Sequence, residues 1–84
     1  MNKYAQAYSL LQRMVGYAEK ADAESIRSLN TQFNAEVERY FHKLHTPIEV
    51  EYDNCRQSCL MSLQIPGLAK DAQKRFSMIP KPKK

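Results

Sequence analysis

The hydrophobic positions of this chain recur at steps of three and four residues, which is the period of an amphipathic α-helix. Breaker residues, chiefly Pro47, the Pro66-Gly67 pair and Pro80, divide the chain into segments of helical length. The pattern therefore predicts a chain of consecutive helices joined by short turns.

The first predicted helix spans about residues 3–20. Its apolar stripe is formed by Tyr4, Ala7, Tyr8, Leu11, Met14, Val15 and Ala18. A flanking stripe is formed by Leu10, Met14, Tyr17 and Ala21. Gly16 lies on the opposite side of the helix. Together the two stripes cover close to half of the helix surface, a width that predicts contact with two neighbouring helices.

The second predicted helix begins after Asp22, a good N-cap residue, and carries Glu24 in its first turn, where the helix dipole favours an anion. Its single apolar stripe is formed by Ile26, Leu29, Phe33, Val37, Tyr40, Phe41 and Leu44. The helix is expected to end before Thr46, because a residue that precedes proline is pushed out of the α region.

The third predicted helix begins with a capping box, in which Thr46 is the N-cap, Pro47 the first helical residue and Glu49 the third. Its stripe is formed by Ile48, Tyr52, Cys55, Cys59 and Leu63. Residues 48–52 also alternate strictly, which is typical of a half-buried strand. The chain offers no second strand to pair with them, so we favour the helix unless a partner chain supplies that strand.

A short fourth helix is predicted from Leu68, Ala72, Phe76 and Ile79, and Pro80 ends it. The expected fold is all-α, a small three-helix up-down-up bundle with a short fourth C-terminal helix and a basic tail. We expect residues 1–79 to form a single helical domain and residues 80–84 to be a flexible basic tail.

The composition agrees with one small globular domain. The chain has 84 residues, of which 43% are hydrophobic and 26% charged. No apolar run approaches the ~18 residues that a transmembrane helix needs. The first ten residues contain no apolar core of a secretory signal, so we expect a cytoplasmic protein without a membrane partner.

No catalytic motif accompanies the helices, and a core this small supports an oriented catalytic cleft poorly. We therefore expect neither an enzyme nor a cofactor. The only C-x3-C pair, Cys55 and Cys59, is interpreted as two small buried thiols, because a disulfide within an intact helix is strained. A zinc site that combines them with His42 and His45 is disfavoured, since Cys55 lies ~13 Å beyond the intervening turn.

Positive charge is concentrated near the end of the chain. Residues 1–65 carry seven basic and eight acidic side chains, whereas residues 66–84 carry six basic side chains and one acidic. The candidate polyanion-binding residues are Lys70, Lys74, Arg75, Lys81, Lys83 and Lys84. Such a cluster attracts phosphate backbones, so DNA or RNA is a candidate partner, bound without sequence specificity.

Apolar residues outside the main stripes are the second feature with functional content. Val50, Leu60 and Met61 face away from the stripe of the third helix, and Leu10, Met14 and Tyr17 flank that of the first. Either the fourth helix covers them or they contact another protein. The candidate partner-binding residues are Leu10, Met14, Tyr17, Val50, Leu60 and Met61.

These patterns favour a non-enzymatic helical regulator or adaptor that binds, and in one version inhibits, a larger intracellular protein. A homodimer is a further use of the same apolar surface. The alternative is a nucleic-acid-associated accessory protein that docks through its basic C-terminal segment.

Overall fold

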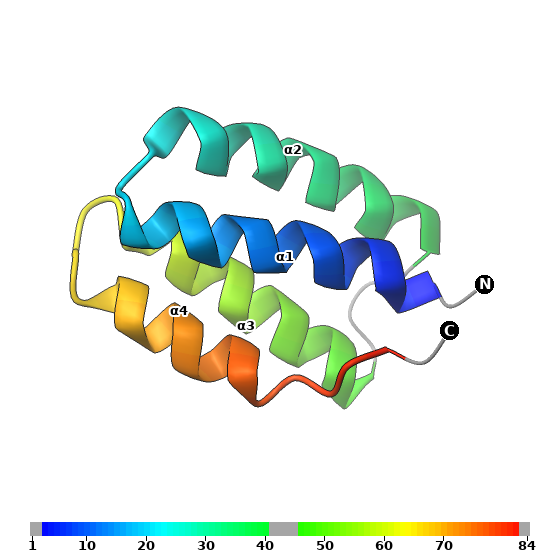
Figure 1. Cartoon of the computed structure of the whole chain (residues 1–84). Helices are drawn as coiled ribbons and strands as arrows, with labels where there is room; N and C mark the ends of the chain where they lie inside the picture. Colours follow the sequence, from blue (N-terminus) through cyan, green and yellow to red (C-terminus); the bar gives the residue numbers. More distant parts are fainter. Residues whose placement is uncertain (1–2, 41–45, 83–84) are drawn as a thin grey trace.

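The computed structural model describes residues 3–40 and 46–82, and it is all-α, as predicted (Figure 1). Its four helices are α1 (Lys3–Glu19), α2 (Ala23–Tyr40), α3 (Pro47–Met61) and α4 (Leu68–Ser77). The described residues contain no strand, and residues 48–52 are helical, so the preference for a helix there is confirmed. The expected continuation of the second helix through Phe41 and Leu44 lies outside the described residues.

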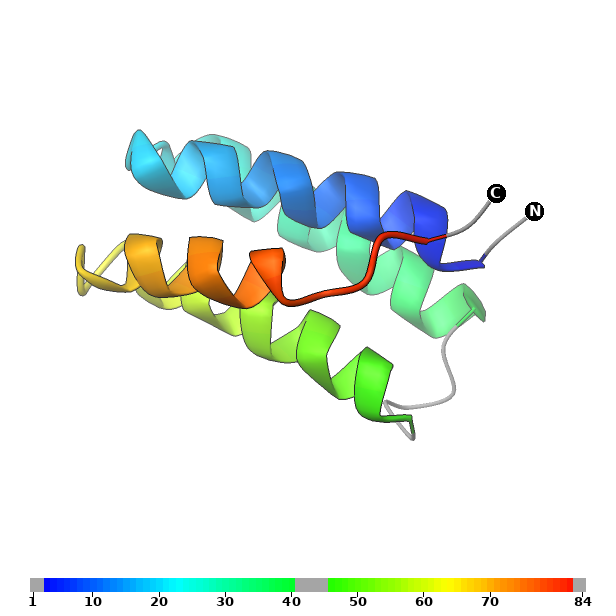
Figure 2. The same cartoon turned by 60° about the horizontal axis from the view of Figure 1, so that its bottom comes forward.

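Successive helices point in opposite directions, and α1 is the central element of the arrangement (Figures 1 and 2). It packs against α2, α3 and α4, whereas α2 and α4, within the part of the chain that the structure describes, do not pack against each other. The turn between α1 and α2 and the turn between α3 and α4 lie at the same end of the molecule. The result is an elongated body of 33 × 23 × 22 Å.

The predicted starts of α2 and α3 are both confirmed by their capping contacts. The Asp22 carboxylate accepts hydrogen bonds from the backbone N–H and the hydroxyl of Ser25, at 3.1 and 2.9 Å. Thr46 has extended backbone angles, and its hydroxyl accepts from the Glu49 N–H at 3.2 Å, with Pro47 as the first residue of α3. These side chains satisfy backbone donors that a helix start leaves without partners inside the helix.

The turn between α1 and α2 is a Schellman motif. Ala21 adopts a left-handed conformation with φ of 55°, and its N–H donates to the Ala18 carbonyl at 3.2 Å. The next N–H, that of Asp22, donates to the Tyr17 carbonyl at 3.1 Å. Ala21 is therefore exposed in the turn, and the prediction that it continues the flanking stripe of α1 is wrong.

The hydrophobic core draws on all four helices. Its buried members are Ala7, Leu10, Leu11, Met14, Val15, Ala18, Ile26, Leu29, Phe33, Tyr52, Cys55, Cys59, Ala72 and Ile79. α1 supplies six of these residues because it is covered from three sides. The broad apolar surface of α1 thus serves one more neighbour than its width predicts.

The fourth helix is fixed to both α1 and α3. The ring of Phe76 lies 4.7 Å, centroid to centroid, from that of Tyr8 on α1. Ala72 is fully buried, and Ile79 is buried just beyond the end of the helix. On the other side, the Ser58 hydroxyl of α3 donates to the Asp71 carboxylate at 2.9 Å.

Candidate protein-binding groove

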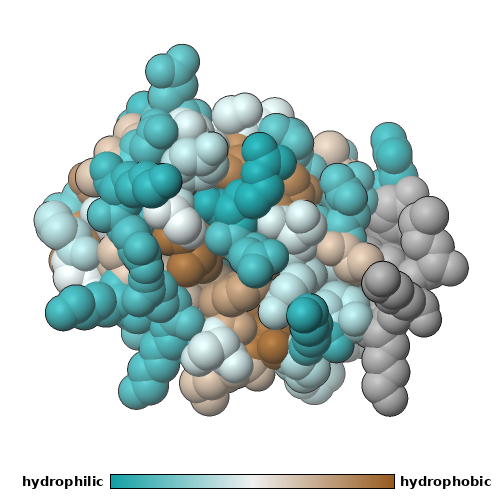
Figure 3. Space-filling view, viewed as in Figure 1, coloured by the Kyte–Doolittle hydropathy of each residue, from teal (hydrophilic) through white to brown (hydrophobic). Residues whose placement is uncertain are grey.

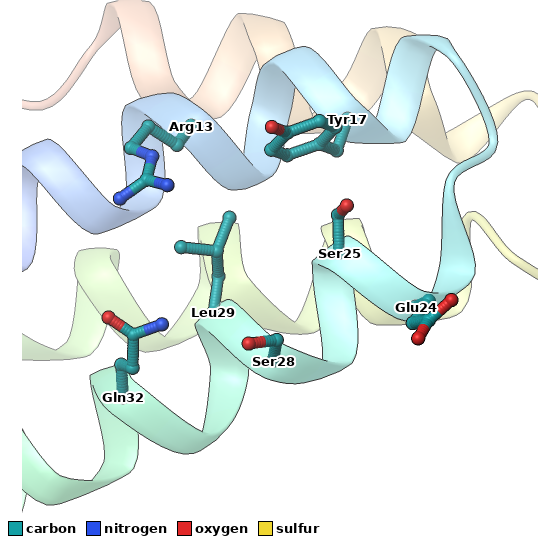
Figure 4. A pocket seen from close by; sticks show the side chains of 7 residues that line it. All are labelled: Arg13, Tyr17, Glu24, Ser25, Ser28, Leu29 and Gln32. Atoms are coloured by element: carbon teal, nitrogen blue, oxygen red, sulfur yellow. The ribbon is translucent and has the colours of Figure 1, made fainter.

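A groove of about 290 Å³ runs along the outer side of the seam between α1 and α2 (Figure 4). The residues that line it are Arg13, Tyr17, Glu24, Ser25, Ser28, Leu29 and Gln32. We call this surface the α1–α2 groove. A hollow of about 200 Å³, lined by Arg13, Gly16, Tyr17 and Lys20, adjoins it on the other side of Tyr17.

Small side chains beside the seam open this groove. Ser25 and Ser28 follow one side of α2 at helical spacing, and the Ser25 hydroxyl is held close to its own helix by Asp22. On α1, a Cβ added at Gly16 would meet no atom within 4 Å, so the adjoining hollow is open. Leu29 is buried and points toward α1, which makes it the apolar floor between the two helices (Figure 4).

Tyr17 is the centre of the groove and is held from both its backbone and its ring. Its carbonyl accepts the N–H groups of Lys20 and Asp22, each at 3.1 Å, so the end of α1 is fixed at this residue. The Lys20 ammonium lies 5.8 Å from the centroid of the Tyr17 ring, within the range of a cation–π interaction. The ring is partly buried against the core and partly available to another molecule.

Charge is distributed unevenly around the α1–α2 groove. Arg13 and Gln32 lie at one end, and Glu24 lies at the other, beyond Ser25 (Figure 4). Lys20 adds a second cation on the α1 side of Tyr17. An incoming molecule therefore meets cations along α1 and a carboxylate at the start of α2.

Of the six residues predicted to bind a partner, the groove contains only Tyr17. Leu10 and Met14 are 2% and 0% exposed, so the prediction that they form an accessible surface is wrong. Their stripe faces the interior because α1 contacts three helices. The apolar pattern of a single helix does not show how many neighbours that helix has.

The other three predicted residues lie on α3, and none of them lines the α1–α2 groove. Val50 and Met61 are 40% and 49% exposed, and they stand eleven positions apart, about 16 Å along the helix axis. Leu60 is partly buried against the core. Ile65 and Met78, which belong to none of the predicted surfaces, are exposed as well.

The polar lining of the groove was also missed. Arg13, Glu24, Ser25, Ser28 and Gln32 gave no signal as an apolar stripe. The available signal was the helical spacing of Ser25, Ser28 and Gln32. These small or polar residues lie beside Leu29 on one side of the second helix.

The residues predicted to bind a polyanion differ in their surroundings. Lys70, Lys74 and Lys81 are exposed. The Arg75 guanidinium instead donates to the Asp71 carboxylate at 2.9 Å, and this contact raises the pKa of Arg75. The hydrogen bonds from Arg75 and then from Ser58 lower the pKa of Asp71. Lys83 and Lys84 lie outside the described residues.

Cys55 and Cys59 are free thiols and both are fully buried, as interpreted from the sequence. The Cys55 thiol donates to the Ala72 carbonyl of α4 at 3.5 Å. The neighbouring Cys59 thiol, and then burial, raise the pKa of Cys55. His42 and His45 lie outside the described residues, and among those that are described no three potential ligands gather into a metal site.

A buried carboxylate ties α1 to α3 away from the groove. Glu49 is 0% exposed and accepts the Tyr4 hydroxyl at 3.2 Å. The Tyr4 ring lies 5.7 Å from that of Tyr52, centroid to centroid, and burial raises the pKa of the Tyr52 phenol. This cluster fixes the start of α1 over α3.

Comparison with protein families, with curated proteins and with solved structures finds no match to this chain. None of the described helices is both long enough and apolar enough to cross a membrane.

Proposed function

We infer that this protein is a non-enzymatic helical adaptor or regulator that binds a larger protein in the cytoplasm. The observation that carries this proposal is the α1–α2 groove, in which a partly buried Tyr17 lies beside Arg13 on α1 and faces Ser25 of α2 across the seam. Tyrosine and arginine are the side chains most enriched, with tryptophan, among the residues that dominate binding at protein interfaces. Inhibition would follow where the bound partner surface includes its functional site.

The scaffold that we assign to this adaptor is an up-down-up bundle of α1, α2 and α3, with α4 as a short fourth helix and a basic tail after it. A larger hollow, about 370 Å³, is lined by Glu19, Pro66, Ala69, Lys70 and Gln73. That hollow offers no aromatic or arginine side chain, so the α1–α2 groove is the better candidate. Hydrophilic side chains cover most of the face toward the viewer in Figure 3, and the hydrophobic surface there is limited to patches.

The test compares the same substitution on two helices. Gln32 and Gln57 are both exposed, but Gln32 lines the groove on α2 and Gln57 lies on α3. We expect the tagged wild-type protein to capture a stoichiometric partner from the cells that make it. Gln32→Trp should reduce this capture about tenfold by filling the groove, whereas Gln57→Trp should preserve it.

Equal capture by both variants would overturn the assignment to the groove. Sedimentation of the purified protein tests whether the occupant of the groove is a second copy of the chain. In that case the wild type would be a dimer, and Gln32→Trp would convert it to a monomer. A monomer that captures no stoichiometric partner would overturn the adaptor proposal as a whole.

The second candidate function is non-specific contact with DNA or RNA. Lys70 and Lys74 are exposed one turn apart on α4, and Lys81 is exposed shortly after it, which supports a basic surface. Binding of this kind should weaken steeply as salt rises. Lys70→Gln with Lys74→Gln should reduce the salt dependence by about two ions, and an unchanged slope would exclude this surface.

A further inference from the structure

The charges around the α1–α2 groove indicate what kind of segment it binds. Arg13 lies on α1 and Lys20 directly follows the last residue of that helix, seven positions further on, which places the two on one side of α1 about 10 Å apart along its axis. Tyr17 lies between them. Across the seam, Glu24 lines the groove from the first turn of α2. One rim is therefore basic, and the facing rim carries a carboxylate.

We propose that the α1–α2 groove binds an amphipathic helix of the partner, with acidic side chains facing Arg13 and Lys20 and a basic side chain facing Glu24. This inference rests on the adaptor function proposed above and specifies the chemistry of the partner. Between the basic rim and the rim that carries Glu24, the apolar side chains of the bound helix pack on the Tyr17 ring.

The shape of the groove favours a helix over an extended peptide. Glu24 and Gln32, at its two ends, are eight residues apart on α2, which corresponds to about 12 Å or two helical turns. Between these ends the surface is made of side chains from two helices, and the described chain presents no strand edge to which a peptide could add. A third helix laid along such a seam contacts it through residues at helical spacing.

The volume of the groove limits what enters it. About 290 Å³ lies at the lower end of the range for small-molecule sites, and the groove has polar hydroxyl and amide groups along its α2 side. It accommodates one or two apolar side chains of a partner. Specificity then depends on the charged rims, since opposite charges steer association and like charges oppose it.

The spacing of the cations predicts the pattern of the bound helix. Acidic residues at positions i and i+7 match the separation of Arg13 and Lys20, and apolar residues at i+3 and i+4 lie between them on the same face. Glu24 lies across the seam from the two cations and would repel an acidic residue. The side of the bound helix that faces Glu24 therefore carries a basic residue.

Two synthetic helical peptides test this pattern with the full chain. Both are alanine-based and carry leucine at i+3 and i+4, and they differ only in having glutamate or lysine at i and i+7. We expect the glutamate peptide to shift the backbone amide resonances of α1 and α2 around Tyr17, with a Kd about tenfold lower than that of the lysine peptide. The preference should shrink as salt is raised.

Charge reversal on the protein completes the test. Arg13→Glu with Lys20→Glu should invert the preference between the two peptides. Arg27→Glu with Arg39→Glu changes the net charge equally at exposed positions outside the groove and should leave the preference unchanged. The proposal is overturned by equal affinities for the two peptides, by resonance shifts away from Tyr17, or by a preference that survives the Arg13 and Lys20 reversal.

These outcomes are separable from the adaptor function itself. If Gln32→Trp abolishes capture of the cellular partner while the peptides bind equally, the groove is a binding site but its occupant is not an acidic helix. If Gln32→Trp has no effect on capture, the groove is not the binding site.

Discussion

The two helix pairs of this fold bury different kinds of side chains. From α1 and α2 the core receives large apolar residues such as Leu11, Met14, Ile26 and Phe33. From α3 the core receives the ring of Tyr52 and two cysteines, together with the Ser58 hydroxyl and the Glu49 carboxylate. Helix α4 itself buries only Ala72 completely. The first pair is thus stabilised mainly by apolar area.

Polar contacts between α3 and α4 fix the position of the fourth helix. The Cys55 thiol and the Ser58 hydroxyl of α3 donate to acceptors on α4, namely the Ala72 carbonyl and the Asp71 carboxylate. A small residue such as alanine lets the two helices approach closely enough for these bonds. The α1–α2 pair is therefore most sensitive to loss of volume, and the α3–α4 pair to gain of volume.

The largest expected effect is that of Phe33→Ala on the α1–α2 side. Phe33 is fully buried, and the Arg56 guanidinium, which also hydrogen-bonds Asn30, lies 5.9 Å from its ring centroid. Truncation should lower the free energy of unfolding by about 3–5 kcal/mol through lost transfer energy and a residual cavity. Urea denaturation followed by circular dichroism measures this. A loss below 1 kcal/mol would contradict the description of this pair.

Ala72→Leu should be the most damaging conservative change on the α3–α4 side. Ala72 is fully buried against Cys55, so added methylene groups have no space and should destabilise the protein by about 1–3 kcal/mol. Ala5→Leu is the matched control, because Ala5 is exposed on α1 and should change stability little. If Ala72→Leu were as well tolerated as the control, the close packing of α4 would be refuted.

The turn at Ala21 provides a smaller effect of opposite sign. A left-handed φ of 55° is strained for alanine and ordinary for glycine, so Ala21→Gly should stabilise the protein by about 0.5–1 kcal/mol. Gly16→Ala should also stabilise it, by up to about 1 kcal/mol, because Gly16 is in the interior of α1 with open space around it. Thermal unfolding of each variant and of the pair measures both effects, and a lower Tm for Ala21→Gly would contradict the Schellman turn.

The smallest effect concerns pH. The folded-state pKa of Asp71 is depressed, so its contribution to stability is complete above the unfolded pKa of about 4 and is lost as the pH falls through the lower folded value. Asp71→Asn should flatten the pH dependence of unfolding below pH 4 without changing it near neutrality. An identical acid profile for wild type and variant would show that Asp71 does not couple to folding.

Much of this fold was predictable from local patterns. The four helices, the caps at Asp22 and Thr46 and the burial of both cysteines follow from periodicity and from residue preferences at helix starts. These features depend on neighbours within about four residues. The sequence therefore contains them directly.

The functional surface was predicted less well, because it depends on contacts between helices. Leu10 and Met14 were assigned to a surface, but α1 has three neighbours that bury them. The α1–α2 groove is formed by small and polar residues of two helices, and neither helix alone indicates that Ser25 and Ser28 face Tyr17 across a seam. Only the packing of one helix on another brings them together.

The hydrogen bond between Cys55 and Ala72 has a consequence for synthesis of the chain. Ala72 follows Cys55 by 17 positions, so the Cys55 thiol lacks this partner on the ribosome until α4 has emerged and docked. In the finished protein Cys55 is fully buried and bonded to α4. We therefore expect alkylation of Cys55 to accelerate when α4 separates from α3, so its labelling rate follows the opening of this last helix.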